Sequence, residues 1–113
     1  MSFLSEIQGL LAPLNIPVET GSFTDAAPDT YLVIVPLAEK FVCFADNLPQ
    51  VDICEARISI FAKGNYTALK NAVVKAFLDA EFTITDRRYI GYENESGYHH
   101  YNVDVANYHE MEE

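Results

Sequence analysis

Three histidines and two cysteines are the side chains of this chain with the most familiar catalytic and metal-binding chemistry. The histidines are His99, His100 and His109, and the cysteines are Cys43 and Cys54. They form no known motif, since the chain has no P-loop, no GxGxxG, no GxSxG elbow, no HExxH and no CxxC. Any chemistry therefore depends on residues that the fold brings together.

The adjacent histidines lie in an alternating segment that predicts a strand. His99 and His100 should then point to opposite faces of a sheet, where they cannot chelate one metal as an i, i+2 pair can. A surface pair is the simpler interpretation, and the alternative is a metal site that combines one histidine with Glu93 or Glu95. We expect no metal and no cofactor.

The cysteines lie in apolar segments that also predict strands. In a reducing compartment, Cys43 and Cys54 are expected to be separate core residues, with a disulfide as the alternative. A Cys–His nucleophilic dyad with His99 or His100 is a further alternative, because residues distant in sequence can meet in a sheet. Apolar neighbours raise the pKa of a thiol, and neither cysteine is placed at a helix N-terminus, so the pattern disfavours a reactive thiolate.

The size and charge of the chain limit its organisation and its partners. Its 113 residues predict a single domain over residues 1–113, with a loose acidic tail after about residue 108. The formal net charge is −10, which repels phosphate, so we expect no direct binding of nucleic acid. No apolar run approaches the roughly 20 residues of a membrane span, and no signal peptide is recognisable, so we expect no membrane association.

The N-terminal half predicts one helix and then strands. Leu4, Ile7 and Leu11 have helical spacing after Ser2, a favoured N-cap, and a short extended piece and a loop follow up to residue 29. Two β-branched segments, 31–35 and 41–44, predict strands that are joined either as a hairpin or as one bulged strand. A turn at 46–49 leads into the next strand.

The middle of the chain alternates with period two, changes to helical spacing and then alternates again. In the predicted strand 51–62, the residues assigned to the core face are Cys54, Ala56, Ile58 and Ile60. Asn65 predicts the N-cap of a helix that runs to about residue 81. Residues 82–92 and 98–105 predict a C-terminal hairpin.

The order of elements is therefore α-β-β-β-α-β-β. It favours an α+β fold in which two helices pack against a mostly antiparallel, or mixed, sheet. The length of the second helix would also suit a right-handed crossover between parallel strands, and the sequence leaves this alternative open.

Three segments carry a resemblance to a known family. A strand that ends at Phe61 is followed by KGNYTAL at 63–69, a polar turn with Gly97 separates Tyr92-Glu93 from Tyr98-His99, and FADN at 44–47 precedes the long strand. Over residues 30–105 the chain resembles the tail-completion proteins of tailed bacteriophages, also called head-to-tail joining or tail-terminator proteins. Glu81 departs from the family, which usually has a glycine there.

The resemblance implies a structural assembly protein of a phage or prophage, with no catalytic residues. It implies a ring of six copies that caps the tail tube, in the tail or neck of the virion, after assembly in the cytoplasm of the bacterial host. Its partners would be the major tail-tube protein and the head-connector (stopper) protein. The residues alone leave two alternatives, a small acidic binding or regulatory module and a cysteine-dependent hydrolase.

The long predicted strand is apolar on both faces, because Ile58 and Ile60 point one way and Ile53 and Phe61 the other. One face must meet the helices. The second is either covered by the first helix or left open as a protein contact, which the hairpin tyrosines would extend. Those tyrosines could instead simply stabilise the sheet. The interface hypothesis names Phe61, Ile53, Tyr92, Tyr98 and Tyr101.

Overall fold

The computed structural model describes residues 3–20, 28–45 and 48–110. The helices are α1 (Phe3–Leu11), the 3-10 turn η1 (Ala12–Leu14) and α2 (Thr67–Asp79), and the strands are β1 (Val18–Thr20), β2 (Thr30–Ala45), β3 (Leu48–Ala62), β4 (Thr83–Tyr92) and β5 (His99–Glu110). Most of the predicted loop at 22–29, the first two residues of the turn at 46–49, and residues 111–113 of the acidic tail lie outside the described residues.

The five described strands form one mixed sheet in the order β1-β2-β3-β5-β4. Only β1 and β2 are parallel, and the other neighbours are antiparallel. Since β3 and β4 both run antiparallel to β5, they are parallel to each other with β5 between them. Helix α2 is therefore a crossover between parallel strands that do not touch, and the α+β prediction with a mixed sheet is confirmed.

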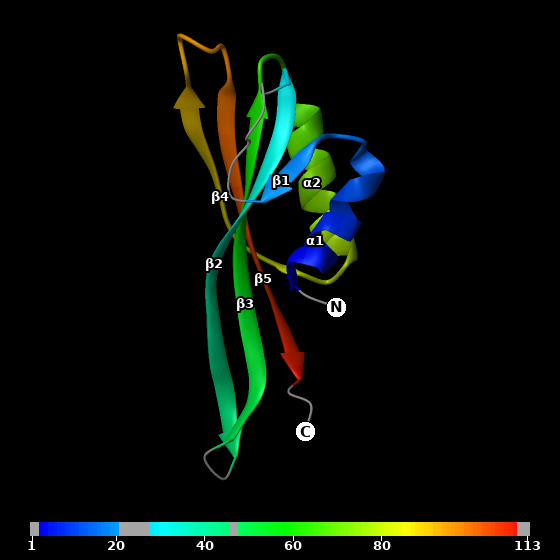
Figure 1. The fold of residues 1–113 in the computed structure, drawn as a ribbon, viewed down its shortest axis with the longest axis vertical. Helices are drawn as coiled ribbons and strands as arrows, with labels where there is room; N and C mark the ends of the chain where they lie inside the picture. The colour runs from blue at the N-terminus through cyan, green and yellow to red at the C-terminus, as the bar shows by residue number, and fades with distance from the viewer. Residues whose placement is uncertain (1–2, 21–27, 46–47, 111–113) are drawn as a thin grey trace.

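The segments 31–35 and 41–44 belong to the single strand β2, which has a bulge between Pro36 and Ala38. The bulged-strand alternative is thus confirmed. β1 pairs only with Leu32, Val33 and Ile34, so the remainder of β2 extends with β3 as a long hairpin well below the helices (Figure 1). This hairpin contributes to a longest dimension of 54 Å.

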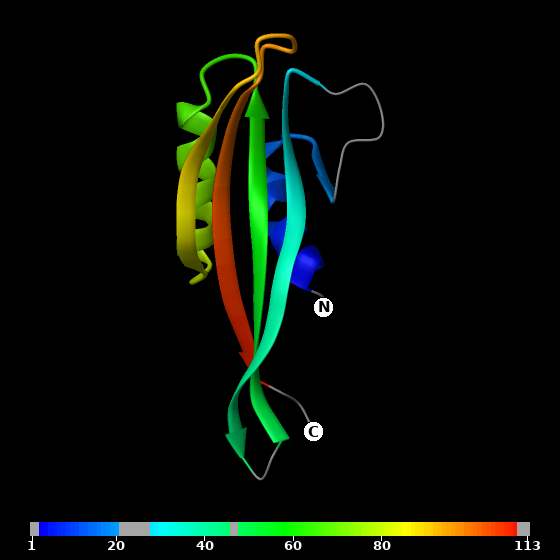
Figure 2. The same ribbon diagram turned by 90° about the vertical axis from the view of Figure 1, so that its left-hand side faces the viewer.

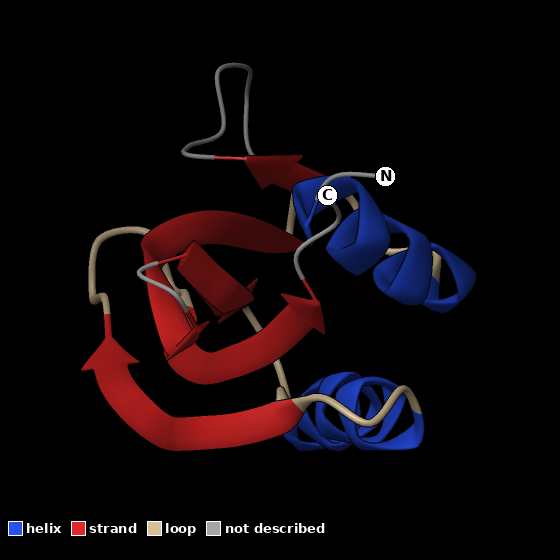
Figure 3. Ribbon diagram, turned by 90° about the horizontal axis from the view of Figure 1, so that it is seen from below, coloured by secondary structure: helices blue, strands red, loops and turns tan. Residues whose placement is uncertain are grey.

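Both helices pack against the same face of the sheet. Figure 2 shows them behind the strands, and Figure 3 shows them on one side when the molecule is seen from below. Ile7 and Leu11 of α1 and Val73 and Phe77 of α2 share one fully buried core with the sheet. The predicted core face of β3 is confirmed, since Cys54, Ala56, Ile58 and Ile60 are at most 4% exposed.

The N-cap of helix α2 is Tyr66, one residue after the predicted Asn65. Asn65 Oδ1 accepts a hydrogen bond from the Thr67 amide at 2.9 Å, while Tyr66 occupies the N-cap position without a side-chain cap. The side chain of Asn65 therefore satisfies a free amide at the helix start, as expected of a capping residue. Gly64 before it has no positive φ, and a Cβ there would meet nothing within 4 Å.

The C-terminal end of α2 is a Schellman motif. The amide of Phe82 donates to the Phe77 carbonyl at 2.9 Å and that of Glu81 to the Leu78 carbonyl at 3.0 Å, with the Phe77 and Phe82 rings 5.1 Å apart. Glu81 has φ +64, a left-handed conformation that favours glycine. The position at which the chain departs from the family pattern is thus one whose backbone suits the family's glycine.

Candidate interaction surface

The sheet face opposite the helices is the candidate functional surface, and we call it the open face. Neither described helix lies on it (Figure 2), so the alternative in which the first helix covers this face is wrong for the described chain, and a protein contact on the face stays a prediction. The β3 residues that alternate with the core positions belong to it, namely Ile53, Glu55, Arg57, Ser59 and Phe61. It combines an aromatic row near the β4–β5 turn with polar pairs further along the strands.

Four rings form the aromatic row, and they come from β2, β3, β5 and the residue just before β5. Phe61 stacks on Tyr31 at a centroid distance of 4.8 Å and on His100 at 4.3 Å. Tyr98 meets Tyr31 and Phe61 edge-on, and its hydroxyl donates a 2.5 Å hydrogen bond to the Pro28 carbonyl. Burial lowers the pKa of His100, so this ring is favoured as the neutral form.

Polar pairs between β3 and β5 occupy the middle of the open face. Ser59 Oγ donates to Asn102 Oδ1 at 2.9 Å, and Arg57 donates to both carboxylate oxygens of Asp104. Ser59, Asn102 and Asp104 are at most 8% exposed. Each of these buried polar groups has a hydrogen-bond partner, so none is left unsatisfied. The pairs also help to fix the register of β3 and β5.

The five residues of the interface hypothesis fall on different parts of the molecule. Ile53 and Phe61 are half-buried on the open face, and Tyr98 lies there 8% exposed. Tyr101 is on the helix side, 9% exposed within the hydrophobic core and below the Lys70 ammonium, so its ring is mainly a packing element. Tyr92 is 51% exposed beside the β4–β5 turn. The structure therefore brings only Ile53, Phe61 and Tyr98 to one face.

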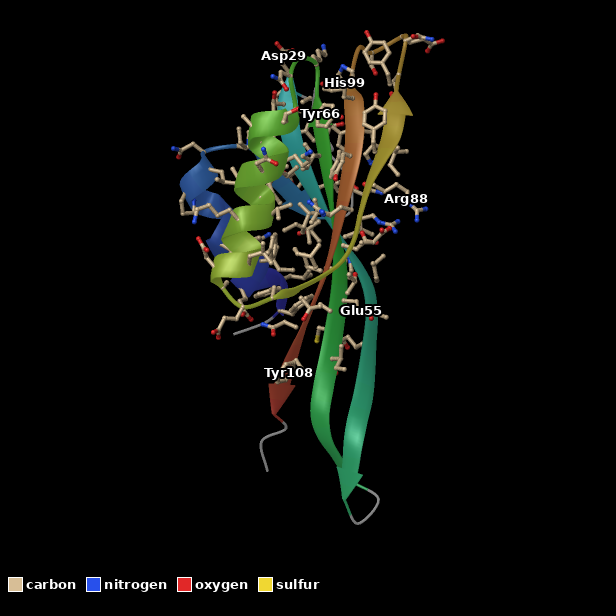
Figure 4. The ribbon with its side chains drawn as sticks, turned by 180° about the vertical axis from the view of Figure 1, so that it is seen from behind. Asp29, Glu55, Tyr66, Arg88, His99 and Tyr108 are labelled. Carbon is tan, nitrogen blue, oxygen red and sulfur yellow. The ribbon has the colours of Figure 1, made fainter. Side chains whose placement is uncertain are left out.

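A second group of rings lies on the helix side at the same end of the sheet. Tyr66 contacts Tyr89, His99 and Tyr101 at centroid distances of 5.5 to 5.8 Å, and Tyr89 Oη lies 3.0 Å from His99 Nδ1. Figure 4 shows Tyr66 and His99 at this end of the molecule. His99 thus faces the helix side while His100 faces the open side, as predicted for adjacent strand residues.

The structure adds two exposed residues on β4 that the interface hypothesis did not name. Tyr89 and Ile90 are 43% and 49% exposed on this edge strand, next to Tyr92, which the hypothesis did include. The alternation of residues 82–92 predicted a strand of the C-terminal hairpin without indicating which of its side chains are exposed. The signal in the sequence was the Arg87-Arg88 pair, because two charges in succession put one on each face of the strand.

Cys54 is free and buried at 4% exposure, as expected of a core residue. Burial raises the pKa of its thiol to about 11, and the carboxylate of Asp52 adds to the effect. A thiol with this pKa is almost entirely protonated at neutral pH and is a poor nucleophile. The side chain of Cys43 lies outside the described residues.

Within the described residues, no three His, Cys, Asp or Glu side chains gather as a metal-binding group. In the same part of the chain, no helix has both the length and the apolar character needed to cross a membrane.

Comparison with known proteins finds similarity of fold among solved structures. No protein-family model and no curated protein matches the chain. Among solved structures, a chain from the "Virion of native gene transfer agent (GTA) particle" is similar at 13% identity, over 90% of this chain and 84% of that chain, with a TM-score of 0.51. The two chains share a fold.

Proposed function

We propose that this protein is a structural component of a phage or prophage particle that completes the tail by capping its tube and forming the joint with the head. In this function it assembles as a ring on the tube, with the major tail-tube protein on one side and the head-connector protein on the other. The joint is built during assembly in the bacterial host and stays in the virion.

The observation that carries the proposal is the open face. A sheet that buries one face under two helices and leaves stacked aromatic rings on the other has a surface suited to protein contact. Two further features support it: the similar fold in a gene transfer agent particle, and the glycine-like backbone of Glu81 at the family's glycine position.

A cysteine-dependent hydrolase is less well supported, because the thiol of Cys54 is buried with a raised pKa. A double variant, Cys43→Ser with Cys54→Ser, separates the two functions. A tail-completion protein should retain its assembly activity once the variant is folded. A folded variant that has lost all activity would favour the hydrolase.

The proposed function is tested by making particles without this protein. Electron microscopy should then show DNA-filled heads without tails, together with free tails of irregular length. Supplying the protein in trans should restore joined particles. Normal virions in its absence would overturn the proposed function.

A further inference from the structure

The two outer edges of the sheet differ in shape and in charge. On one side β4 is an edge strand, with three exposed apolar side chains and the exposed Arg87 and Arg88. Arg88 points away from the sheet at this edge (Figure 4). We call the residues Arg87, Arg88, Tyr89, Ile90 and Tyr92 the β4 edge.

On the other side, β2 becomes the outer strand of the described sheet beyond Ile34, where its pairing with β1 ends. A groove of about 590 Å³ lies there, between the start of α1 and the bulge of β2. It is lined by Phe3, Leu4, Pro36, Leu37, Ala38, Glu39 and Glu55. Five of these seven residues are apolar and two are acidic, and Leu37 is 42% exposed.

We propose that this groove binds the β4 edge of a second copy of the chain. The inference rests on the proposed function for its biological setting, and it names the two surfaces by which neighbouring copies touch. Exposed tyrosine and isoleucine side chains of one copy would fill an apolar groove of the next, while Arg87 approaches Glu39.

The local charges of the two surfaces are complementary, which supports a second copy as the occupant. Because a protein of net charge −10 repels other copies of itself, a contact between copies requires such local attraction. The described residues give Arg87 and Glu39 no ion-pair partner, and both side chains are exposed. Only two of the seven basic residues are neighbours in sequence, and both lie on the β4 edge.

The backbone indicates that the contact is made by side chains and not by strand pairing. β4 has irregularities at Thr85 and Ile90, and the free part of β2 has Pro36 and the bulge at Leu37. Bulges and edge prolines oppose the addition of another strand. Both edges are therefore protected against open-ended sheet growth and still present apolar side chains.

The two surfaces lie on opposite edges, so the contact joins unlike patches. A two-fold dimer through the β4 edge would place Arg87 of both copies together, which like-charge repulsion disfavours. Glu39 and Arg87 are also offset along the strands, because Glu39 is level with Asn107 of β5 and Arg87 with Val103. Four residues correspond to about 14 Å along a strand, so the two patches lie at different levels of the sheet. Repetition of a contact between such unlike patches generates a ring or a helix.

Concentration-dependent NMR spectra of the labelled wild-type protein test the inference without a variant. Between micromolar and millimolar concentration, amide shifts should change on both the β4 edge and the groove. Changes at the β4 edge alone would indicate a two-fold contact and overturn the inference. The absence of any change up to the solubility limit, or changes confined to the open face, would also overturn it.

Charge reversal tests the pairing of the surfaces. The double variant Arg87→Glu/Arg88→Glu and the single variant Glu39→Arg should each weaken self-association by about tenfold or more, and the variant that carries all three changes should recover most of it. Lys75→Glu, an exposed residue on the far side of α2, is the matched control. An equal loss in the control, or no recovery in the triple variant, would overturn the inference.

A joining assay, in which the protein supplied in trans must restore joined heads and tails, separates this inference from the proposed function. A wild-type protein that joins tails to heads but shows no contact between its own copies overturns the inference and leaves the function standing. A contact measured by NMR for a protein whose absence leaves virions normal overturns the function and leaves the contact standing.

Discussion

Arg57 and Asp104 form a bidentate ion pair across β3 and β5, with Nε 2.9 Å from Oδ1 and Nη2 3.1 Å from Oδ2. The pair is asymmetric, because the Arg57 side chain is 40% exposed and that of Asp104 only 12%. The guanidinium can reach water without its partner, whereas the carboxylate depends on the arginine for its hydrogen bonds.

Replacement of the arginine should therefore cost more than replacement of the aspartate. We expect Arg57→Ala to lower the free energy of unfolding by about 1–3 kcal/mol, because it leaves a buried carboxylate unpaired. Asp104→Ala should cost less than about 1 kcal/mol, since the exposed guanidinium is rehydrated. Urea denaturation of both variants and of the double variant measures the difference. Equal losses in the two single variants would contradict this asymmetry.

The aromatic row gives a direct test of the open face. Phe61→Asp removes the ring between Tyr31 and His100, and we expect a folded protein that fails to join tails to heads, because a charge in a desolvated contact costs several kcal/mol. Circular dichroism and the joining assay are performed on one preparation. Leu78→Asp, at a 55% exposed position of α2, is the matched control and should join normally. If the Phe61→Asp protein does not fold, the ring belongs to the core. If it folds and still joins tails to heads, the ring is not part of the contact.

The left-handed backbone of Glu81 predicts a stabilising substitution. Glu81→Gly should raise the free energy of unfolding by about 0.5–1 kcal/mol, since a non-glycine residue costs about 1–2 kcal/mol in this conformation and glycine loses part of that gain through the entropy of the unfolded chain. Thermal and urea unfolding provide the measurement. Gly64→Ala, at a position without positive φ and without a nearby atom, is the control and should not destabilise by steric strain. A less stable Glu81→Gly protein would contradict the helix-end geometry.

The lowered pKa of His100 predicts a dependence of stability on pH. Burial favours the neutral ring in the folded protein, whereas in the unfolded chain the ordinary pKa is 6.5. The unfolded chain thus binds a proton first as the pH falls, and stability is lost below about pH 6.5. Hydrogen bonding to Asn102 and the charge of Glu93 oppose this shift, and the charge of Arg57 adds to it.

The contribution of His100 is isolated by comparing the wild type with His100→Gln from about pH 7 to 5, the range in which histidine titrates. The wild type should lose more of its free energy of unfolding over this range than the variant. His99→Gln, on the other side of β5, controls for the loss of a histidine. Parallel pH profiles for wild type and His100→Gln would show that this ring does not resist protonation.

Much of the fold was predictable because its signals are local. The alternation of β3 identified the core face, the helical spacing identified α2, and the adjacency of His99 and His100 placed them on opposite faces. These patterns depend on neighbours within a few residues, and the period of the backbone converts them directly into faces.

The remainder depends on contacts between residues distant in sequence. Periodicity does not reveal that β5 inserts between β3 and β4, nor that α1 joins α2 on one face and leaves the other open. Tyr101 shows the same limit within the candidate surface. Its place in a tyrosine-rich hairpin suggested a contact residue, but its cross-strand position opposite Ile60 and under Lys70 makes it part of the core. The groove, which joins residues of α1, β2 and β3, has no signature in any single segment.

The insertion of β5 between β3 and β4 has a consequence for how the protein reaches its native state. During synthesis β4 emerges before β5, so it has no strand with which to pair, and α2 has only part of its sheet to cover. The β2–β3 hairpin is local and can form early, but its pairing with β5 joins residues up to 59 positions apart, from Val51 to Glu110. Closure of such long loops slows folding. Most of β5 must therefore emerge from the ribosome before the core can close. Until then the apolar faces of β3 and α2 are exposed to chaperones and to neighbouring nascent chains.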